Sequence, residues 1–91
     1  MMGPSMRIHK KTQAGTMQSS DLIVFVEPAE TLEVDIESTV QQQFGHLIRE
    51  RVDLVLARLG LESGRVMVSD RGALDYAIEA RVETAVRRGG A

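Results

Sequence analysis

The sequence predicts an α+β domain with the element order β-β-α-β-α, in which two helices cover one face of a three-stranded sheet. Two short stretches, residues 22–27 and 32–37, have the apolar patterns of strands. Two longer stretches, residues 40–59 and 74–86, repeat apolar side chains every three or four positions, as amphipathic helices do. A chain of 91 residues suffices for one such domain with one hydrophobic core.

The first two predicted strands differ in their expected exposure to solvent. The run DLIVFVEP is continuously apolar until Pro28, which predicts a strand covered on both faces and therefore central in the sheet. The run TLEVDIE alternates strictly, so Leu32, Val34 and Ile36 point to one side and three acidic residues to the other. This second strand is predicted to lie at an edge, because one of its faces is wet.

Helical spacing begins after Ser38, where STVQ has the form of a capping box. The apolar positions continue to Leu59, and Gly60 supplies a helix end. RVMVSD is the predicted third strand. A second helix follows DRG, with Asp70 as its candidate cap and Gly89-Gly90 as its frayed end.

The order of the strands follows from the handedness of crossovers. A right-handed crossover through the first helix makes strands two and three parallel. The apolar first strand then fits between them, antiparallel to both, which gives the sheet order 2-1-3. Both helices are expected on the face that receives Leu32, Val34 and Ile36. The opposite face retains apolar side chains of strand one, so we expect the N-terminal segment or a partner to cover it.

The chain is predicted to divide into three parts. Residues 1–12 read as a flexible N-terminal arm, of which residues 1–5 resemble a cloning remnant and carry no functional inference. Residues 13–88 form the single domain, and residues 89–91 form a frayed C-terminus.

The composition excludes several functional classes. No cysteine is present, which removes disulfides, thiolate nucleophiles and cysteine-bound zinc, and is typical of a cytoplasmic protein. The net charge of -2 and the scattered basic residues indicate no nucleic-acid partner. The apolar run at residues 22–26 is too short to span a membrane. Glu33, Asp35 and Glu37 are interpreted as a solvated strand face, and no metal site is predicted.

The stretch QAGTMQSSD, residues 13–21, places two adjacent serines at the entrance to the first strand. A nucleophilic serine needs a base within hydrogen-bond reach. The two histidines, His9 and His46, lie in the N-terminal arm and the first helix, and no G-x-S-x-G motif is present. The residues therefore disfavour a hydrolase, and without further information Ser19 and Ser20 read as ordinary loop serines.

Three stretches together resemble the acyl carrier protein, or gamma subunit, of bacterial citrate lyase, over about Thr12 to Val86. They are AGTMQSSD, VQQQFGHLIRERVDLVLARLG and DRGALDYAIEARVETA, and their order and spacing make the match specific. The resemblance implies a non-catalytic carrier subunit. In that family a phosphoribosyl-dephospho-coenzyme A group is joined by a phosphodiester to the serine that follows AGTxx. This position is Ser19 here, and Ser20 is the second choice.

The resemblance also implies partners and a reaction. The thiol of the attached group would carry acetyl and citryl thioesters while citrate is cleaved to acetate and oxaloacetate by the alpha and beta subunits. A prosthetic-group transferase would attach the group. An exposed serine with small, uncharged neighbours such as Ala14 and Gly15 suits this role.

Two alternatives stay open at this point. The carrier of malonate decarboxylase bears the same group but lacks the GALD and QQQFG features of this chain. A non-carrier α+β interaction module would have a compatible fold. An ordinary phosphopantetheine carrier is disfavoured, because that family is a helical bundle with the order Asp-Ser-Leu, whereas Ser-Asp-Leu precedes a strand here.

Overall fold

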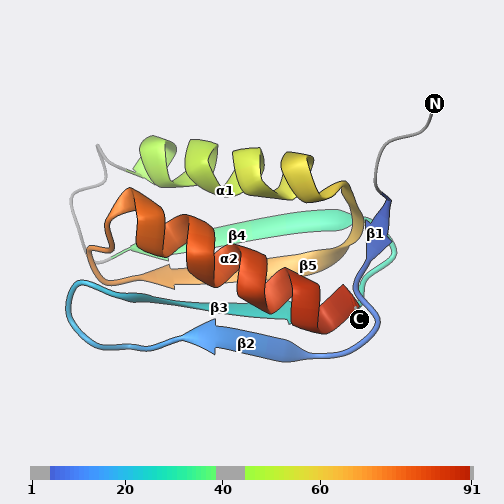
Figure 1. Cartoon of the computed structure of the whole chain (residues 1–91), viewed down its shortest axis with the longest axis horizontal. Coiled ribbons are helices and arrows are strands. Elements are labelled where there is room, and N and C mark those ends of the chain that lie inside the picture. Colours follow the sequence, from blue (N-terminus) through green and yellow to red (C-terminus); the bar gives the residue numbers. More distant parts are fainter. Residues whose placement is uncertain (1–4, 39–44, 91) are drawn as a thin grey trace.

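The computed structural model describes residues 5–38 and 45–90, which form a curled sheet with two helices on one face (Figure 1). The described strands are β1 (Met6–Arg7), β2 (Thr12–Gly15), β3 (Leu22–Glu27), β4 (Leu32–Ser38) and β5 (Leu61–Asp70). The helices are α1 (Gly45–Leu59) and α2 (Asp75–Gly90). The predicted α+β class is confirmed, and so is the position of both helices on the same face of the sheet.

Strand β5 is the centre of the sheet. It pairs antiparallel with β3, where Leu22 lies opposite Asp70, and parallel with β4, where Ser38 lies opposite the same residue. Strand β2 extends the sheet on the far side of β3 in antiparallel orientation. The short β1 pairs parallel with the beginning of β5.

The prediction of three strands in the order 2-1-3 is wrong. The described residues contain five strands, and the predicted third strand, β5, lies between the other two in the order β4-β5-β3-β2. The crossover through α1 brings β5 directly beside β4, so β3 takes the remaining edge of β5. The predicted orientations are right, since β4 is parallel to β5 and β3 is antiparallel to it. Strand β3 is also internal as predicted, but its second neighbour is β2.

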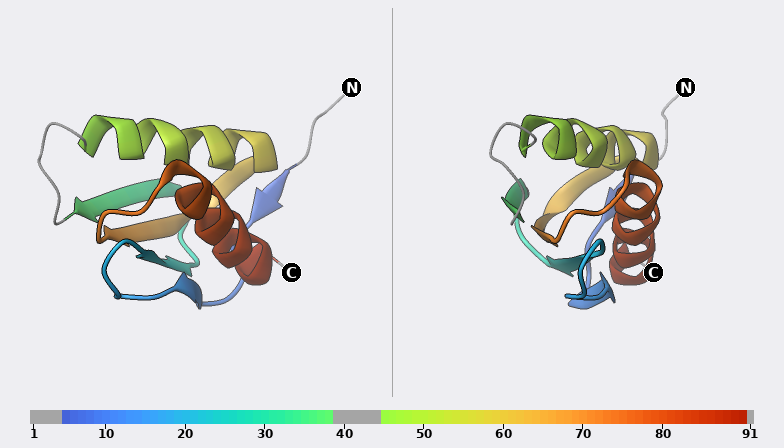
Figure 2. Two further views of the ribbon diagram at one scale, coloured as in Figure 1. Left: turned by 60° about the vertical axis from the view of Figure 1, so that its left-hand side comes forward. Right: turned by 90° about the vertical axis from the view of Figure 1, so that its left-hand side faces the viewer.

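One aliphatic core lies between the sheet and the helices, on the concave side that Figure 2 shows. Alternation along β3 and β5 sends every second side chain into it, and each helix contributes one apolar stripe. Fully burying a valine or leucine side chain stabilises the fold by about 1.5–3 kcal/mol. The core side chains are those of Ile8, Ala14, Leu22, Val24, Val26, Ile48, Val52, Val55, Leu56, Leu59, Leu61, Val66, Val68, Ile78, Val82, Ala85 and Val86.

The ends of the helices differ in part from the prediction. Ser38, the first residue of the predicted capping box STVQ, is the last residue of β4, and the remainder of the predicted helix start, residues 39–44, lies outside the described residues. Helix α1 ends at Leu59, and Gly60 follows with a φ of 71°. This is the conformation in which glycine commonly ends a helix.

Asp70 is not the cap of the second helix, because β5 continues to Asp70 and α2 begins at Asp75. Its carboxylate instead accepts hydrogen bonds from the amides of Gly72 and Ala73, both at 3.0 Å, and shapes the connection between β5 and α2. At its other end α2 runs to Gly90, beyond the predicted end of the helix. Gly89 is buried there, where a Cβ atom would come within 2.8 Å of Val26.

The N-terminal segment adds to the sheet at two places. Residues 6–7 form β1, the Ile8 side chain is in the core, and the His9 amide donates to the Gly89 carbonyl oxygen at 2.8 Å. Residues 12–15 form β2. The segment therefore does not cover the outer face of the sheet, where the Phe25 side chain remains 38% exposed. Flexibility of residues 1–12 stays a prediction. The core contacts of Ile8 point in the opposite direction.

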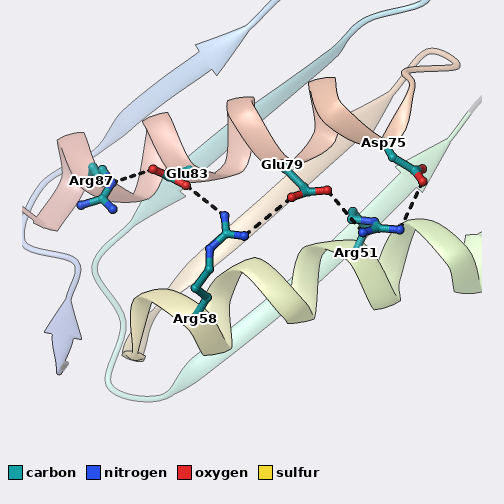
Figure 3. A network of polar contacts seen from close by, with 6 residues as sticks. All are labelled: Arg51, Arg58, Asp75, Glu79, Glu83 and Arg87. Carbon is teal, nitrogen blue, oxygen red and sulfur yellow. Dashed lines mark hydrogen bonds and ion pairs between the residues drawn. The ribbon is translucent and has the colours of Figure 1, made fainter. Parts of the chain in front are cut away.

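Charged side chains connect the two helices in a ladder (Figure 3). Acidic residues spaced four apart on α2 face arginines spaced seven apart on α1, so charges of opposite sign alternate along the seam. Helix α1 contributes Arg51 and Arg58, whose side chains contact α2 as well as solvent. The ion pairs are Arg51–Asp75 (3.2 Å), Arg51–Glu79 (3.3 Å), Arg58–Glu79 (3.7 Å), Arg58–Glu83 (3.0 Å) and Arg87–Glu83 (3.0 Å).

Candidate functional site

The two serines lie in the hairpin connection between β2 and β3, at one end of the sheet (Figure 1). The connection opens at Gly15, whose φ is 101°. A side chain there would collide with the carbonyl oxygen of Leu22, so the close approach of the two strands requires glycine. The Thr16 amide then donates to that same oxygen at 3.0 Å and closes the ladder.

A four-residue turn from Gln18 to Asp21 presents both serines to solvent. The Asp21 amide donates to the Gln18 carbonyl oxygen at 3.1 Å, which places Ser19 and Ser20 at the two central positions. Ser20 has a φ of 66°, the left-handed conformation that a type II turn requires at its third position. Both serines are exposed, as the carrier interpretation predicts.

Arg71, the residue directly after β5, holds this turn through its backbone. The Ser20 amide donates to the Arg71 carbonyl oxygen and the Arg71 amide donates to the Asp21 carbonyl oxygen, both at 2.8 Å. Two residues of the turn, Ser20 and Asp21, thus lie opposite one residue, Arg71, which is the arrangement of a G1-type bulge. Ser20 is tied to the sheet through its backbone, and Ser19 occupies the outer corner.

Asp21 anchors the turn to helix α2. Its carboxylate accepts hydrogen bonds from the Thr16 hydroxyl at 2.7 Å, from the Leu22 amide at 2.8 Å and from the Arg81 guanidinium at 3.2 and 3.3 Å. The Thr16 hydroxyl lowers the pKa of Asp21 most, and the Leu22 amide and Arg81 lower it further against the opposing effect of burial. The one acidic group of the turn is therefore held as a carboxylate with its charge compensated.

The Ser19 hydroxyl is exposed and has no general base beside it among the described residues. Within residues 5–38 and 45–90, no hydrogen bond joins the hydroxyl of either serine to a histidine or to any other side chain. His9 follows β1 and His46 lies in α1, so neither belongs to the turn. An exposed hydroxyl without an adjacent base is a poor nucleophile, but an enzyme that brings its own base can reach it.

Other candidate chemistry is limited over the described part of the chain. Its residues contain no cluster of three or more potential metal ligands. Asp35 in the acidic row of β4 pairs with Arg65 at 3.2 Å, and Glu37 accepts a hydrogen bond from Ser69 at 3.4 Å. Neither described helix has the length and apolar character needed to cross a membrane.

Sequence reasoning found Ser19 and Ser20 but missed Arg71 and Arg81, which contact the same turn. Arg81 is 60 positions away from Asp21 along the chain, and only the packing of α2 against the sheet brings them together. The one sequence feature that could have pointed to Arg71 is its position directly after the third predicted strand. That strand was expected to end near the start of an antiparallel strand, which the serines precede.

Comparison with known proteins identifies relatives over nearly the whole chain. Residues 9–89 match the family model described as malonate decarboxylase delta subunit (MdcD). A citrate lyase acyl carrier protein from Pectobacterium carotovorum is 51% identical over 84 residues, which are 91% of this chain and 88% of that protein. A citrate lyase acyl carrier protein from Haemophilus influenzae is 47% identical over 83 residues, 91% of this chain and 87% of that protein.

A solved structure has the same fold. In the crystal structure of a Pseudomonas malonate decarboxylase hetero-tetramer in complex with malonate, one chain superposes with a TM-score of 0.81 at 16% sequence identity. The superposition covers 98% of this chain and 93% of that one. At this identity the likeness concerns the fold alone.

Proposed function

We propose, from the premise that this chain belongs to the family of citrate lyase acyl carrier proteins, that Ser19 is the attachment site of its prosthetic group. Membership of an acyl carrier family implies a covalently attached group. The observation that carries the assignment to Ser19 is its place at the exposed outer corner of the Gln18–Asp21 turn. Ser20 is the second choice, because its backbone is tied to Arg71.

The turn fits the group that the family resemblance implies, phosphoribosyl-dephospho-coenzyme A joined through a phosphodiester. The Ser19 hydroxyl is exposed, its neighbours Met17, Gln18 and Ser20 are uncharged, and the charge of Asp21 is already compensated. When bound, the group supplies the thiol on which acyl groups travel as thioesters. The chain itself has no cysteine that would compete with that thiol.

The chain acts in this proposal as a tether and a docking surface. A carrier raises the effective concentration of its acyl group at the active sites of partner subunits, without free diffusion of a coenzyme. The partners are the alpha and beta subunits of citrate lyase, which cleave citrate to acetate and oxaloacetate, and the transferase that loads Ser19. We propose a cytoplasmic location for the protein, and in this proposal no residue of the turn takes part in bond cleavage.

A second candidate is the carrier of malonate decarboxylase. The description of the matching family model and the structural superposition both name that enzyme. The identity of 51% to a citrate lyase carrier, compared with 16% to the chain of the malonate decarboxylase structure, favours the first assignment.

Intact-mass spectrometry tests the proposal on purified protein with and without the cognate transferase and its prosthetic-group precursor. The native chain and Ser20→Ala are expected to gain the mass of the group, and Ser19→Ala to gain nothing. Ser19→Ala is expected to keep its Tm, because an exposed turn hydroxyl contributes little to folding.

The remaining outcomes each decide a point. Modification of Ser19→Ala that disappears only when Ser20 is also replaced would move the site by one residue. Absence of any mass gain in the native chain would refute the carrier assignment. Loaded protein that supports citrate cleavage with the alpha and beta subunits, and not malonate decarboxylation, would separate the two candidate enzymes.

A further inference from the structure

Arg71 carries a guanidinium group that has no partner among the described residues. Its Nε atom is buried and donates to no acceptor. Every other arginine of the described residues donates to a carboxylate or to a backbone carbonyl, Arg65 with Glu27 and Asp35 being one example. A buried donor without an acceptor costs about 1–3 kcal/mol, and native structures usually provide one. The orphaned Nε therefore indicates an acceptor that the polypeptide does not supply.

The backbone fixes Arg71 beside the turn that carries Ser19. Both the amide and the carbonyl oxygen of Arg71 are used in the 2.8 Å hydrogen bonds to Asp21 and Ser20. The next two amides, of Gly72 and Ala73, are held by the carboxylate of Asp70, which is only 1% exposed. Hydrogen bonds therefore hold the backbone of Arg71 and of the two residues after it. Ser20, whose amide donates to Arg71, directly follows Ser19 in the sequence.

The acidic group within the turn does not compete for this guanidinium. The Asp21 carboxylate is occupied by the Thr16 hydroxyl, the Leu22 amide and Arg81. Asp70, the residue before Arg71, is occupied by Ser38 at 2.9 Å and by two backbone amides. An anion attached at Ser19 would therefore meet an unpaired cation and no uncompensated negative charge from these two residues.

We infer that Arg71 binds the phosphodiester that links the prosthetic group to Ser19. The inference rests on the proposed function, since it requires that Ser19 be modified. A guanidinium presents its Nε–H and one terminal N–H as a planar fork that matches two phosphate oxygens. Arg71 is a positioning residue in this role: it fixes the root of the arm against the turn and leaves the remainder of the arm to move between active sites.

The test compares unloaded and loaded protein by NMR, so that it needs no activity measurement. Loading is expected to shift the Nε–Hε resonance of Arg71 and to leave that of Arg65 in place. In the loaded protein, Arg71→Gln is expected to change the phosphorus chemical shift of the phosphodiester and Arg65→Gln to leave it unchanged. Arg65 is the matched control because it lies on β5, which directly precedes Arg71, and already has carboxylate partners. Arg71→Lys keeps the charge but not the fork, and its shift is expected to lie between those of native protein and Arg71→Gln.

The outcomes separate this inference from the proposed function. A chain that gains no mass with the transferase refutes the proposed function before any resonance is compared. A chain that is loaded at Ser19 but shows no shift of the Arg71 Nε–Hε resonance overturns the role of Arg71 and leaves the carrier function standing. This measurement uses the native sequence, so it decides the point even if the Arg71→Gln variant fails to fold.

Discussion

Ser20 occupies a backbone conformation that suits glycine better than serine. Its φ of 66° places the Cβ atom close to the neighbouring carbonyl, at a cost of about 1–2 kcal/mol for residues with a side chain. Strain of this kind persists only where surrounding contacts impose it. Here the hydrogen bond to Arg71 and the closing bond of the turn impose it, and the exposed corner at Ser19 is the result.

Replacing Ser20 by glycine is therefore expected to stabilise the protein. Relief of the left-handed strain outweighs the extra freedom that glycine gives the unfolded chain, and we expect a gain of up to about 1 kcal/mol. Urea unfolding measures it. Ser19→Gly is the matched control, because Ser19 is not among the described residues with positive φ and glycine there should be destabilising. Equal effects of the two changes would show that the backbone conformation is not the cause.

The carboxylate of Asp21 makes stability depend on pH in the acid range. Its pKa is lowered in the folded protein, chiefly by the Thr16 hydroxyl. A lowered folded pKa gives stability that is present above the unfolded value, about 3.9, and is lost as the pH falls through the folded pKa. Asp21→Asn should then lower the free energy of unfolding by about 1–2 kcal/mol near neutral pH. The difference in unfolding free energy between this variant and native protein should shrink below about pH 4.

Denaturant titrations at a series of pH values measure this dependence. The control is Asp53→Asn, since Asp53 is half exposed and, among the residues that the structure describes, pairs only with Arg49 on its own helix. That variant should change stability by less than about 0.5 kcal/mol. A loss in Asp21→Asn that stays constant from pH 7 to pH 3 would mean that the amide disturbs packing and that ionisation is not involved.

Sequence reasoning reached the serines at this scale but not the geometry around them. The small, uncharged residues before Asp21 indicated an exposed loop, and the resemblance selected Ser19. The positive φ of Ser20 could not be predicted, because serine rarely adopts it and the strain depends on Arg71. The predicted strand order paired β3 with β5 as the structure does, but it did not contain their register, on which contacts between residues more than 50 positions apart depend.

At the scale of elements, the charged ladder connects α1 and α2 along their shared edge. Its groups are partly exposed, so each ion pair contributes little to the stability of the fold. Hydrogen bonds from Arg87 and then Arg58 lower the pKa of Glu83, which remains ionised through the physiological range. Glu79 is the acidic residue that pairs with both arginines of α1, Arg51 and Arg58, so its loss divides the ladder in the middle.

Glu79→Gln is expected to lower the free energy of unfolding by about 0.5–1 kcal/mol at low salt, with a smaller loss in 1 M NaCl. Screening shortens the reach of these charges from about 10 Å at 0.1 M salt to about 3 Å at 1 M. Unfolding at the two salt concentrations measures the difference. Glu50→Gln, a change of the same kind at an exposed site on α1, should be neutral. A loss that is equal at both salt concentrations would assign the effect of Glu79 to packing.

The elements whose sequences have a periodic apolar pattern were predicted. The elements that are strands only because they pair with a neighbouring strand were not. The alternation of β4 and the stripes of α1 and α2 could be read directly from the sequence. Strand β2, TQAG, has no such pattern and is a strand because the free edge of β3 is available to it. The first residues of β5, which include Gly64 with a φ of 140°, also gave no strand signal.

For the whole molecule, the N-terminal segment is where prediction and contacts point in different directions. The sequence predicts a flexible arm over residues 1–12. The amides of Ile8 and His9 donate to Ser63 at 3.1 Å and to Gly89 at 2.8 Å, and the Ile8 side chain lies in the core.

We expect these two amide protons to exchange slowly, since their release requires the core to open. The exposed amide of Ser19 provides the reference for fast exchange. Exchange at Ile8 and His9 as fast as at Ser19 would support the flexible arm.

The hydrogen bond between His9 and Gly89 joins the beginning and the end of the described chain at one end of the molecule, and the Ser19 turn lies at the other (Figure 1). An affinity tag, a fluorophore or a linker attached near either end of the described residues would therefore lie at the opposite end of the molecule from the proposed loading site. A carrier immobilised in this way should leave its serine open to the transferase, so that loading and acyl transfer could be followed on a sensor chip. Fusion of two carriers head to tail should likewise keep both turns accessible.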